Sequence, residues 1–234
     1  MFSENPADPA APQPLKKRLA EPLNPGDMGV LMAGAGVGKT ACLTHIALDH
    51  LLRGIQVIHV GIDGTPEKIK VWYLEQLKNI ATAASGEDPS KLLRAIEPLR
   101  FILTYLHQTF SIEKLERSLT NLREQVKFSP AMMVLDGLDF DRTSRETLES
   151  LRDFAVKQGL SVWMSARTHR HISAVNERGV PYPCHECDDL FSSILLLEPI
   201  RDAIRVKVLK QDGDAVTSSP ELFLDPQTCL LREI

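Results

Sequence analysis

The sequence predicts an α/β fold in which helices cover both faces of a mainly parallel sheet and a β-hairpin lies at the C-terminal end. Two observations lead to this prediction. From about residue 27 onward, short apolar runs of strand length alternate with amphipathic segments of helical length, and such alternation with right-handed crossovers builds a parallel sheet covered on both sides. Near the C-terminus, two apolar runs follow each other after only a short gap, which is the pattern of a hairpin.

Length and composition fit one globular domain with a short appendage. The 234 residues are 43% hydrophobic and 25% charged, which excludes a wholly disordered chain, and 27 basic against 31 acidic residues give a net charge of −4. With 13 glycines and 4 cysteines, a collagen-like repeat and a disulfide scaffold are excluded as well. No apolar run reaches the roughly 20 residues of a membrane span, and the first residues lack a secretory apolar segment. We therefore expect a cytoplasmic protein without a membrane partner.

Proline dominates the first part of the chain. Six of the 15 prolines fall within the first 25 residues. Because proline lacks a backbone N–H and fixes φ, this stretch cannot form helix interiors or central strands. We predict that residues 1–24 form a flexible, proline-rich arm and residues 25–234 form one folded domain.

Local signals locate the elements of the domain. Thr65 and Pro66 suit the N-cap and the first position of a helix, because the hydroxyl accepts a backbone hydrogen bond and proline needs no donor there. Apolar residues spaced by three and four over 112–126 indicate an amphipathic helix, and Thr143 with Glu146 forms a capping box. The predicted strands are 28–33, 56–62, 101–106, 131–136, 160–166, 192–199, 203–211 and 221–225, and the predicted helices are 40–52, one from Pro66, 112–126 and 143–156.

A glycine-rich turn joins the first strand to the first helix. Residues 33–40 read AGAGVGKT and fit the phosphate-loop pattern G-x-x-x-x-G-K-[ST], with Ala33 in place of the leading glycine. Small side chains let several backbone N–H groups point at phosphate oxygens, and the following helix adds the positive end of its dipole. A chance match in a glycine-rich turn is the alternative. The predicted nucleotide-binding residues are Ala33, Gly34, Ala35, Gly36, Val37, Gly38, Lys39, Thr40 and Ala41.

Three side chains have expected tasks in this site. Lys39 is expected to neutralise charge on the β- and γ-phosphates, and Thr40 to ligate Mg²⁺. Asp136 closes the apolar run 131–136, at the strand end where a metal-orienting carboxylate belongs in a phosphate-loop protein. An aspartate in an ordinary strand-end turn is the alternative interpretation of Asp136.

From about Gly26 to the C-terminus, the chain resembles the RecA-like ATPases and, within them, the KaiC/RadA-like branch. The landmarks that follow the family's order are AGAGVGKT, VIHVGIDGTPEKI, MMVLDGLDF, LSVWMSART, CDDLFSSILLLE and VKVLKQDG. The resemblance implies ATP and Mg²⁺ as cofactors and assembly into a homo-oligomer such as a hexameric ring.

The resemblance also assigns a role to the end of the second strand. KaiC-like proteins carry two glutamates there, before Thr-Pro, that activate the attacking water; the matching residues here are Asp63 and Gly64. Asp63 is therefore implied as the catalytic residue that positions water, with less reach than glutamate and without a second acid. We expect slow hydrolysis. An ordinary Asp-Gly turn is the alternative.

A second departure from the family lies at residues 209–213. KaiC-like rings carry Lys-x-Arg-Gly here, and both cations reach the γ-phosphate of the adjacent subunit. Lys210 matches the lysine and is implied to act in catalysis in trans, whereas Asp212 replaces the arginine. Since an arginine finger contributes about 10³–10⁵ in rate in GTPases, its replacement predicts ATP binding without fast turnover.

The segment 166–187 is locally basic in an acidic protein, with Arg167, His169, Arg170 and His171 near its start. In RecA-like filaments and rings the corresponding loop faces the central axis and contacts nucleic acid, so the resemblance implies DNA as a further partner. A surface loop without a ligand is the alternative.

Cys184 and Cys187 form a C-x-x-C pair, which is half of a zinc-type arrangement. His169 or His171 could complete such a site across the loop. A redox-active pair and two unligated thiols are the alternatives.

The sequence thus supports three hypotheses on function. The first is an Mg·ATP-binding protein that acts as a slow ATPase or a nucleotide-dependent assembly switch. The second is a DNA-binding recombination or repair module in which nucleotide stabilises assembly and hydrolysis is vestigial. The third, a small-molecule kinase, is disfavoured because an arginine-rich lid segment is missing.

Overall fold

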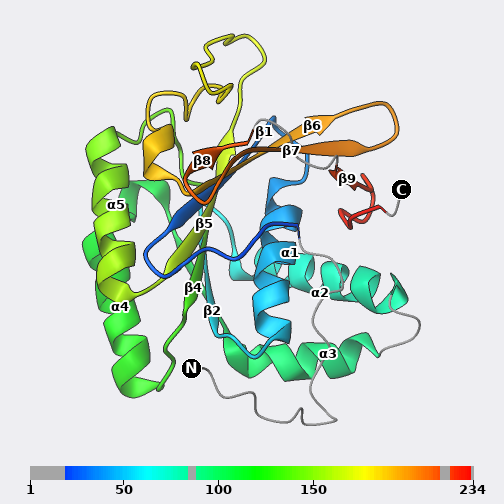
Figure 1. Ribbon diagram of the computed structural model, residues 1–234. Helices are drawn as coiled ribbons and strands as arrows, with labels where there is room; N and C mark the ends of the chain where they lie inside the picture. Colours follow the sequence, from blue (N-terminus) through cyan, green and yellow to red (C-terminus); the bar gives the residue numbers. More distant parts are fainter. Residues whose placement is uncertain (1–18, 84–87, 217–221, 233–234) are drawn as a thin grey trace.

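One sheet runs through the domain and carries helices on both faces (Figure 1). The computed structural model describes residues 19–83, 88–216 and 222–232. In these ranges the sheet has nine strands in the order β3-β2-β4-β5-β1-β6-β7-β8, and β9 pairs with β7. The strands are β1 (Met28–Ala33), β2 (Val57–Ile62), β3 (Arg100–Tyr105), β4 (Met132–Asp136), β5 (Ser161–Arg167), β6 (Ser193–Pro199), β7 (Ile204–Gln211), β8 (Asp214–Ala215) and β9 (Leu222–Leu224).

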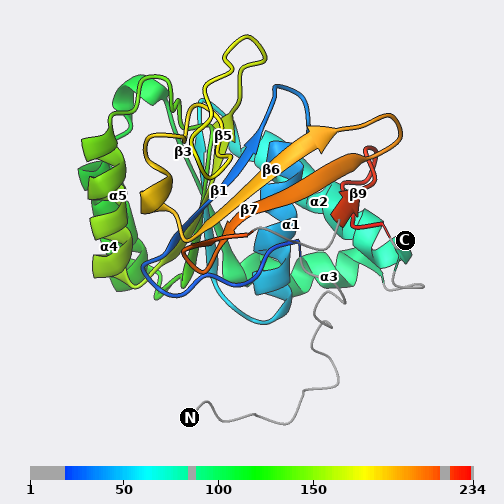
Figure 2. The ribbon, with the colours of Figure 1, turned by 45° about the horizontal axis from the view of Figure 1, so that its top comes forward.

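The strands from β3 to β6 in this order are parallel, and β7 pairs antiparallel with β6, β8 and β9. β6 and β7 form the predicted hairpin, which extends beyond the parallel part of the sheet (Figure 2). The predicted fold class is therefore confirmed. This architecture is compatible with Rossmann-like and phosphate-loop folds.

Two hydrophobic cores lie on opposite faces of the sheet. On β4, Met132 and Val134 join the core beneath α1, α2 and α3, whereas Met133 and Leu135 join the core beneath α4 and α5 (Figure 1). This burial on both faces explains why the central strands are apolar at nearly every position. The helices are α1 (Lys39–Leu52), α2 (Pro66–Ala83), α3 (Pro89–Ile96), α4 (Ile112–Gln125) and α5 (Arg145–Gln158), with 3₁₀ turns at Glu97–Leu99, His107–Thr109 and Asp188–Leu190.

Two helix starts test the predicted caps. Thr65 Oγ1 accepts a backbone hydrogen bond at 3.4 Å at the start of α2, as predicted. The predicted cap of α5, Thr143, was wrong by one residue, since Ser144 caps the helix by accepting from the N–H of Thr147 at 3.3 Å. The Thr143 hydroxyl instead donates to the Asp139 carbonyl at 2.6 Å, in the turn before the helix.

α3 was not predicted. Its start carries ordinary signals, because Asp88 accepts a hydrogen bond from the N–H of Ser90 at 2.9 Å and Pro89 occupies the first turn. However, only Leu92 and Ile96 of its 8 residues are buried. Such a short apolar pattern does not reveal a helix.

Part of the predicted arm contacts the domain. Leu19 is 3% exposed and packs, with Ala20 and Leu23, on the core beneath α1. The rest of that arm, residues 1–18, lies outside the described residues. Within the described ranges, no helix combines the length and the apolar character that a membrane span requires.

Candidate functional site

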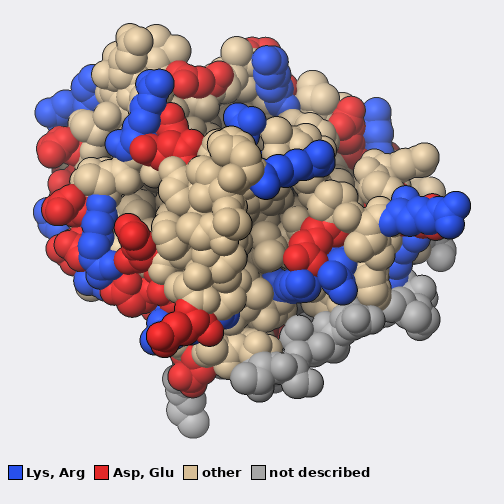
Figure 3. Space-filling model, turned by 90° about the horizontal axis from the view of Figure 1, so that it is seen from above, with Lys and Arg blue, Asp and Glu red and all other residues tan. Residues whose placement is uncertain are grey.

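The carboxyl ends of the parallel strands meet at the upper edge of the molecule in Figure 1. Because β5 lies between β1 and β4, the loops that follow these three strands are neighbours. Ligands of open α/β sheets bind at this kind of edge. Seen from above, acidic and basic side chains are interspersed around an uncharged central area (Figure 3).

The loop between β1 and α1 turns on glycines. Gly36 and Gly38 have φ of +74° and +100°, left-handed values that favour glycine. The residues before this loop belong to β1, and the residues after it belong to α1. Of the predicted binding residues, Ala33 and Ala41 are buried, Gly34, Val37, Gly38, Lys39 and Thr40 are half-buried, and Ala35 and Gly36 are exposed.

The start of α1 differs from those of α4 and α5. Gly38 is its N-cap, so no side chain caps the helix, and its first turn contains no acidic residue. In contrast, Ser111 and Ser144 cap α4 and α5, and backbone hydrogen bonds lower the pKa of Glu113 and Glu146 in their first turns. The first N–H groups of α1 and its positive dipole end therefore face the glycine loop, which favours an anion.

Lys39 folds back over this loop. Its Nζ donates to the carbonyl oxygens of Ala33 at 3.1 Å and Gly34 at 2.9 Å. Burial lowers the pKa of Lys39 and Arg167 lowers it further, while Asp136 opposes both effects. Asp136 therefore attracts the ammonium group, and Arg167 repels it.

Two hydroxyl groups converge on Asp136. Thr40 Oγ1 donates to one carboxylate oxygen at 2.6 Å, and Ser165 Oγ donates to the other at 2.6 Å. The chain then turns at Gly137, where φ is +93° and a Cβ would lie 2.5 Å from the Ile62 carbonyl oxygen. Only glycine fits this turn, which helps to hold Asp136 beside the start of α1.

The residues present fit a magnesium ion that also binds phosphate. Thr40 and Asp136 offer a hydroxyl and a carboxylate oxygen side by side, and Mg²⁺ prefers such hard oxygen ligands. In the described part of the chain, no group of three or more His, Cys, Asp and Glu side chains forms a metal cage. Mg²⁺ in nucleotide sites uses one or two protein oxygens together with water and phosphate.

Arg167 is the last residue of β5. Side chains alternate along a strand, so Arg167 belongs to the same face as Trp163, which packs beneath α1, and Ser165, which bonds to the carboxylate of β4. In the β1–β5 ladder, Arg167 lies opposite Ala33. It is exposed, and it makes no hydrogen bond or ion pair with any residue that the structure describes.

Asp63 follows β2 with a φ of +56°. Its N–H donates to the Tyr105 carbonyl at 2.8 Å, and its Oδ1 accepts from the N–H of His107 at 2.8 Å. Asp63 also lines a cavity of about 420 Å³ with Gly137 and Asp139. Its carboxylate is therefore tied to the 3₁₀ turn after β3 but borders a space that reaches the turn after β4.

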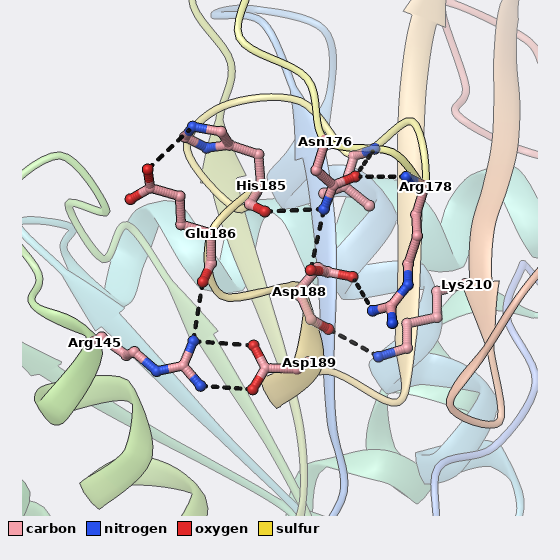
Figure 4. A network of polar contacts seen from close by, with 9 residues as sticks. Arg145, Asn176, Arg178, His185, Glu186, Asp188, Asp189 and Lys210 are labelled. Atoms are coloured by element: carbon pink, nitrogen blue, oxygen red, sulfur yellow. Dashed lines mark hydrogen bonds and ion pairs between the residues drawn. The ribbon is translucent and has the colours of Figure 1, made fainter.

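Lys210 of β7 points toward the backbone of Asp188 (Figure 4). It is 5% exposed, its Nζ donates to the Asp188 carbonyl at 2.9 Å, and burial lowers its pKa. Ion pairs hold the same segment: Arg178 bonds to the Asp188 carboxylate at 2.8 Å, and Arg145 bonds to both oxygens of Asp189 at 3.0 and 2.6 Å. Lys210 belongs to this network.

Two side chains of the loop after β5 contact the carboxylate of Asp141. His169 Nε2 and the Tyr182 hydroxyl each lie 2.8 Å from one oxygen of this carboxylate. The rings of His171, His169, Tyr182 and His185 form a row with successive centroid separations of 5.6, 5.8 and 5.7 Å. The ring planes meet at 63°, 56° and 54°, so this loop carries a row of tilted rings rather than a purely cationic surface.

All four cysteines are buried free thiols. The N–H of Cys187 donates to the Cys184 carbonyl at 3.1 Å, and no metal-binding group forms around the two thiols in the described residues. Cys187 raises the pKa of Cys184, and Cys229 likewise raises the pKa of Cys42. A Cβ at Gly38 would lie 3.1 Å from Cys229 Sγ, so the C-terminal segment closes against the glycine loop.

Sequence reasoning missed two residues of this site. Ser165 received no role, and Arg167 was assigned to the predicted nucleic-acid loop. Alternation along β5 was the available signal, because it puts both residues on the face that α1 covers. No protein-family model and no curated protein matches this chain.

Proposed function

We propose that this chain binds a nucleoside triphosphate together with Mg²⁺, and the resemblance to RecA-like ATPases favours ATP. The observation that carries the proposal is the convergence of Lys39, Thr40 and Asp136 at an uncapped helix start. Thr40 and Asp136 are 96 positions apart in sequence, yet their side chains are 2.6 Å apart. A glycine-rich turn without a ligand would not need this arrangement.

Each residue has a task in this proposal. The N–H groups of the glycine loop and the first turn of α1 bind phosphate oxygens, and Lys39 exchanges its carbonyl acceptors for phosphate. Thr40 and Asp136 would hold Mg²⁺, which when bound neutralises phosphate charge. Ser165 orients Asp136 by bonding to its second carboxylate oxygen.

Hydrolysis is proposed to be slow. Asp63 would position water from the cavity that it lines, but its Oδ1 already accepts the His107 N–H. Lys210 would have to leave the Asp188 carbonyl before it could act in a neighbouring subunit. The proposed protein is therefore a slow ATPase or a nucleotide-dependent assembly switch, in a homo-oligomer of the RecA/KaiC kind.

Isothermal titration with Mg·ATP tests nucleotide binding. We expect Lys39→Ala to weaken binding about 100-fold, since it removes charge-assisted contacts to phosphate. The matched control is Lys70→Ala, an exposed lysine on α2 that should leave affinity unchanged. Thermal melts verify that both variants fold. The proposal is rejected if the wild type takes up no triphosphate or if the two variants behave alike.

Light scattering after size exclusion tests the assembly switch. We expect a larger species with Mg·ATP or a non-hydrolysable analogue than without nucleotide. A constant mass in all conditions would reject the assembly switch but would not contradict nucleotide binding.

A second candidate function, nucleic-acid binding, is favoured by the row of four rings beside the exposed Arg170. Rings stack on bases and cations bind phosphates without sequence preference. We expect single-stranded DNA affinity to fall with salt and to weaken in Arg170→Ala, but not in Arg201→Ala, an exposed arginine in the β6–β7 turn. No measurable affinity at low salt would reject this candidate.

A further inference from the structure

Arg167 is held at the phosphate loop by a strand. The β1–β5 ladder sets it opposite Ala33, the residue at which the glycine loop begins. The N–H of the next residue, Thr168, donates to the Ala33 carbonyl at 3.0 Å. The backbone of Arg167 is thus fixed relative to the loop, and its side chain belongs to the face that carries Ser165 and Asp136.

The charges around Arg167 are incompletely balanced. Arg167 has no carboxylate partner among the described residues, whereas Arg145 and Arg178 each bind one. Lys39 bonds only to carbonyl oxygens, and of the two nearby charges Asp136 attracts it more strongly than Arg167 repels it. Two neighbouring cations repel each other, and a bound anion converts this repulsion into attraction for both.

We propose that Arg167 binds the terminal phosphate of the nucleotide from within the same subunit and makes the site selective for triphosphates over diphosphates. This inference rests on the proposed nucleotide-binding function. A guanidinium group suits the task, because its planar donors pair with two phosphate oxygens at once.

Selectivity for triphosphates follows because different groups of the site bind different phosphates. The glycine loop, the start of α1 and Lys39 are available to any phosphate chain that enters. A triphosphate brings one more charged group, and Arg167 supplies the further cation for it at the neighbouring strand end. A diphosphate lacks that group and loses little when Arg167 is absent.

Arg167 supplies a cation that the end of β7 does not. Lys210 is 5% exposed and bonded to the Asp188 carbonyl, and residue 212, just after β7, is an aspartate. With Arg167, each subunit supplies its own cation for the terminal phosphate. Triphosphate selectivity then needs no neighbouring subunit.

Titrations with Mg·ATP and Mg·ADP test this inference. We expect Arg167→Ala to weaken ATP binding about 10- to 100-fold and ADP binding less than about 3-fold, from the usual strength of charge-assisted contacts. Arg167→Lys should be intermediate, because lysine keeps the charge but not the paired donors. The control Arg201→Ala, an exposed arginine in the β6–β7 turn, should change neither affinity.

Two outcomes overturn the inference while leaving nucleotide binding in place. Equal weakening for ATP and ADP in Arg167→Ala would mean that Arg167 adds only general positive potential. Unchanged affinities for both, with a loss of single-stranded DNA binding, would assign Arg167 to the nucleic-acid loop. If the wild type binds neither nucleotide, the proposed function fails and this inference fails with it.

Discussion

The two halves of the candidate site are built differently. In the half proposed to bind phosphate and metal, Lys39 bonds to the loop carbonyls and Thr40 bonds to the Asp136 carboxylate at the start of α1. In the half proposed to act in hydrolysis, Asp63 and Lys210 are bonded to backbone groups of other segments, in the 3₁₀ turn after β3 and in the 3₁₀ turn before β6.

This difference separates binding from turnover. Binding requires that phosphate and metal contacts be in place before the ligand arrives. Hydrolysis also requires a group that is free to position water and a cation that is free to meet the developing charge. A chain with the first half arranged and the second half engaged elsewhere should bind the triphosphate and cleave it only slowly.

The largest expected effect lies in the metal half. Asp136→Ala should weaken Mg·ATP binding about 100-fold, since a charged metal ligand is lost. Without Mg²⁺, in EDTA, the same variant should bind ATP at least as well as the wild type, because a negative charge near the phosphates is gone. Asp153→Ala, an exposed acid on α5, is the control. Equal losses with and without Mg²⁺ would contradict a metal role for Asp136.

Acid pH should destabilise the fold that carries the phosphate half of the site. Burial lowers the pKa of His45 on α1 and of His59 on β2 to about 4. In the unfolded chain both titrate near 6.5, so the unfolded state binds more protons between these values. Stability should therefore fall as pH drops from about 6.5 to 4, by up to about 1.4 kcal/mol per pH unit for each histidine.

Chemical denaturation between pH 7.5 and 4.5 measures this slope. Both ring nitrogens of His45 are buried without a partner in the described residues. We expect His45→Leu to reduce the slope without lowering stability at neutral pH. An unchanged slope in this variant would show that the acid sensitivity arises elsewhere.

In the hydrolysis half, Lys210→Met should mainly affect stability. It removes the donor to the buried Asp188 carbonyl, and an unpaired buried acceptor costs about 1–3 kcal/mol. Lys207→Met on the same strand, whose ion pair with Glu198 is partly exposed, should cost less than about 1 kcal/mol. If Lys210→Met kept its stability but lost turnover, the two halves would not differ as described.

Asp63→Asn should have the smallest effect. An asparagine side-chain oxygen can still accept the His107 N–H, so this variant removes the charge with little change to the turn. Phosphate release should fall by less than about tenfold, below the roughly 10²–10⁴-fold of a full general base, and ATP affinity should stay constant. Identical release rates in variant and wild type would exclude Asp63 from catalysis.

Local sequence patterns were sufficient for most of the fold. β1 has the predicted bounds, 28–33, because an apolar run that ends in glycines needs no information from elsewhere in the chain. The position of Asp136 followed from the end of another apolar run, and the parallel sheet brings that end to the glycine loop. α3 was missed because its buried face comprises only two residues.

The contacts that engage Asp63 and Lys210 could not be predicted. The bond that engages Asp63 comes from a residue 44 positions away, and the carbonyl that engages Lys210 comes from one 22 positions away. Arg167 was assigned to the loop that follows it, although strand pairing puts it opposite Ala33. Such outcomes depend on strand order and loop packing, which a residue pattern does not encode.

The most direct test of the difference between the two halves is the identity of the bound nucleotide over time. The protein is mixed with Mg·ATP, separated rapidly from free nucleotide at intervals, and quenched, and the bound ATP and ADP are quantified. We expect triphosphate that remains intact on the wild type for many minutes and is absent from Lys39→Ala. Conversion of the bound ATP to ADP within seconds, or no bound nucleotide at all, would contradict this account.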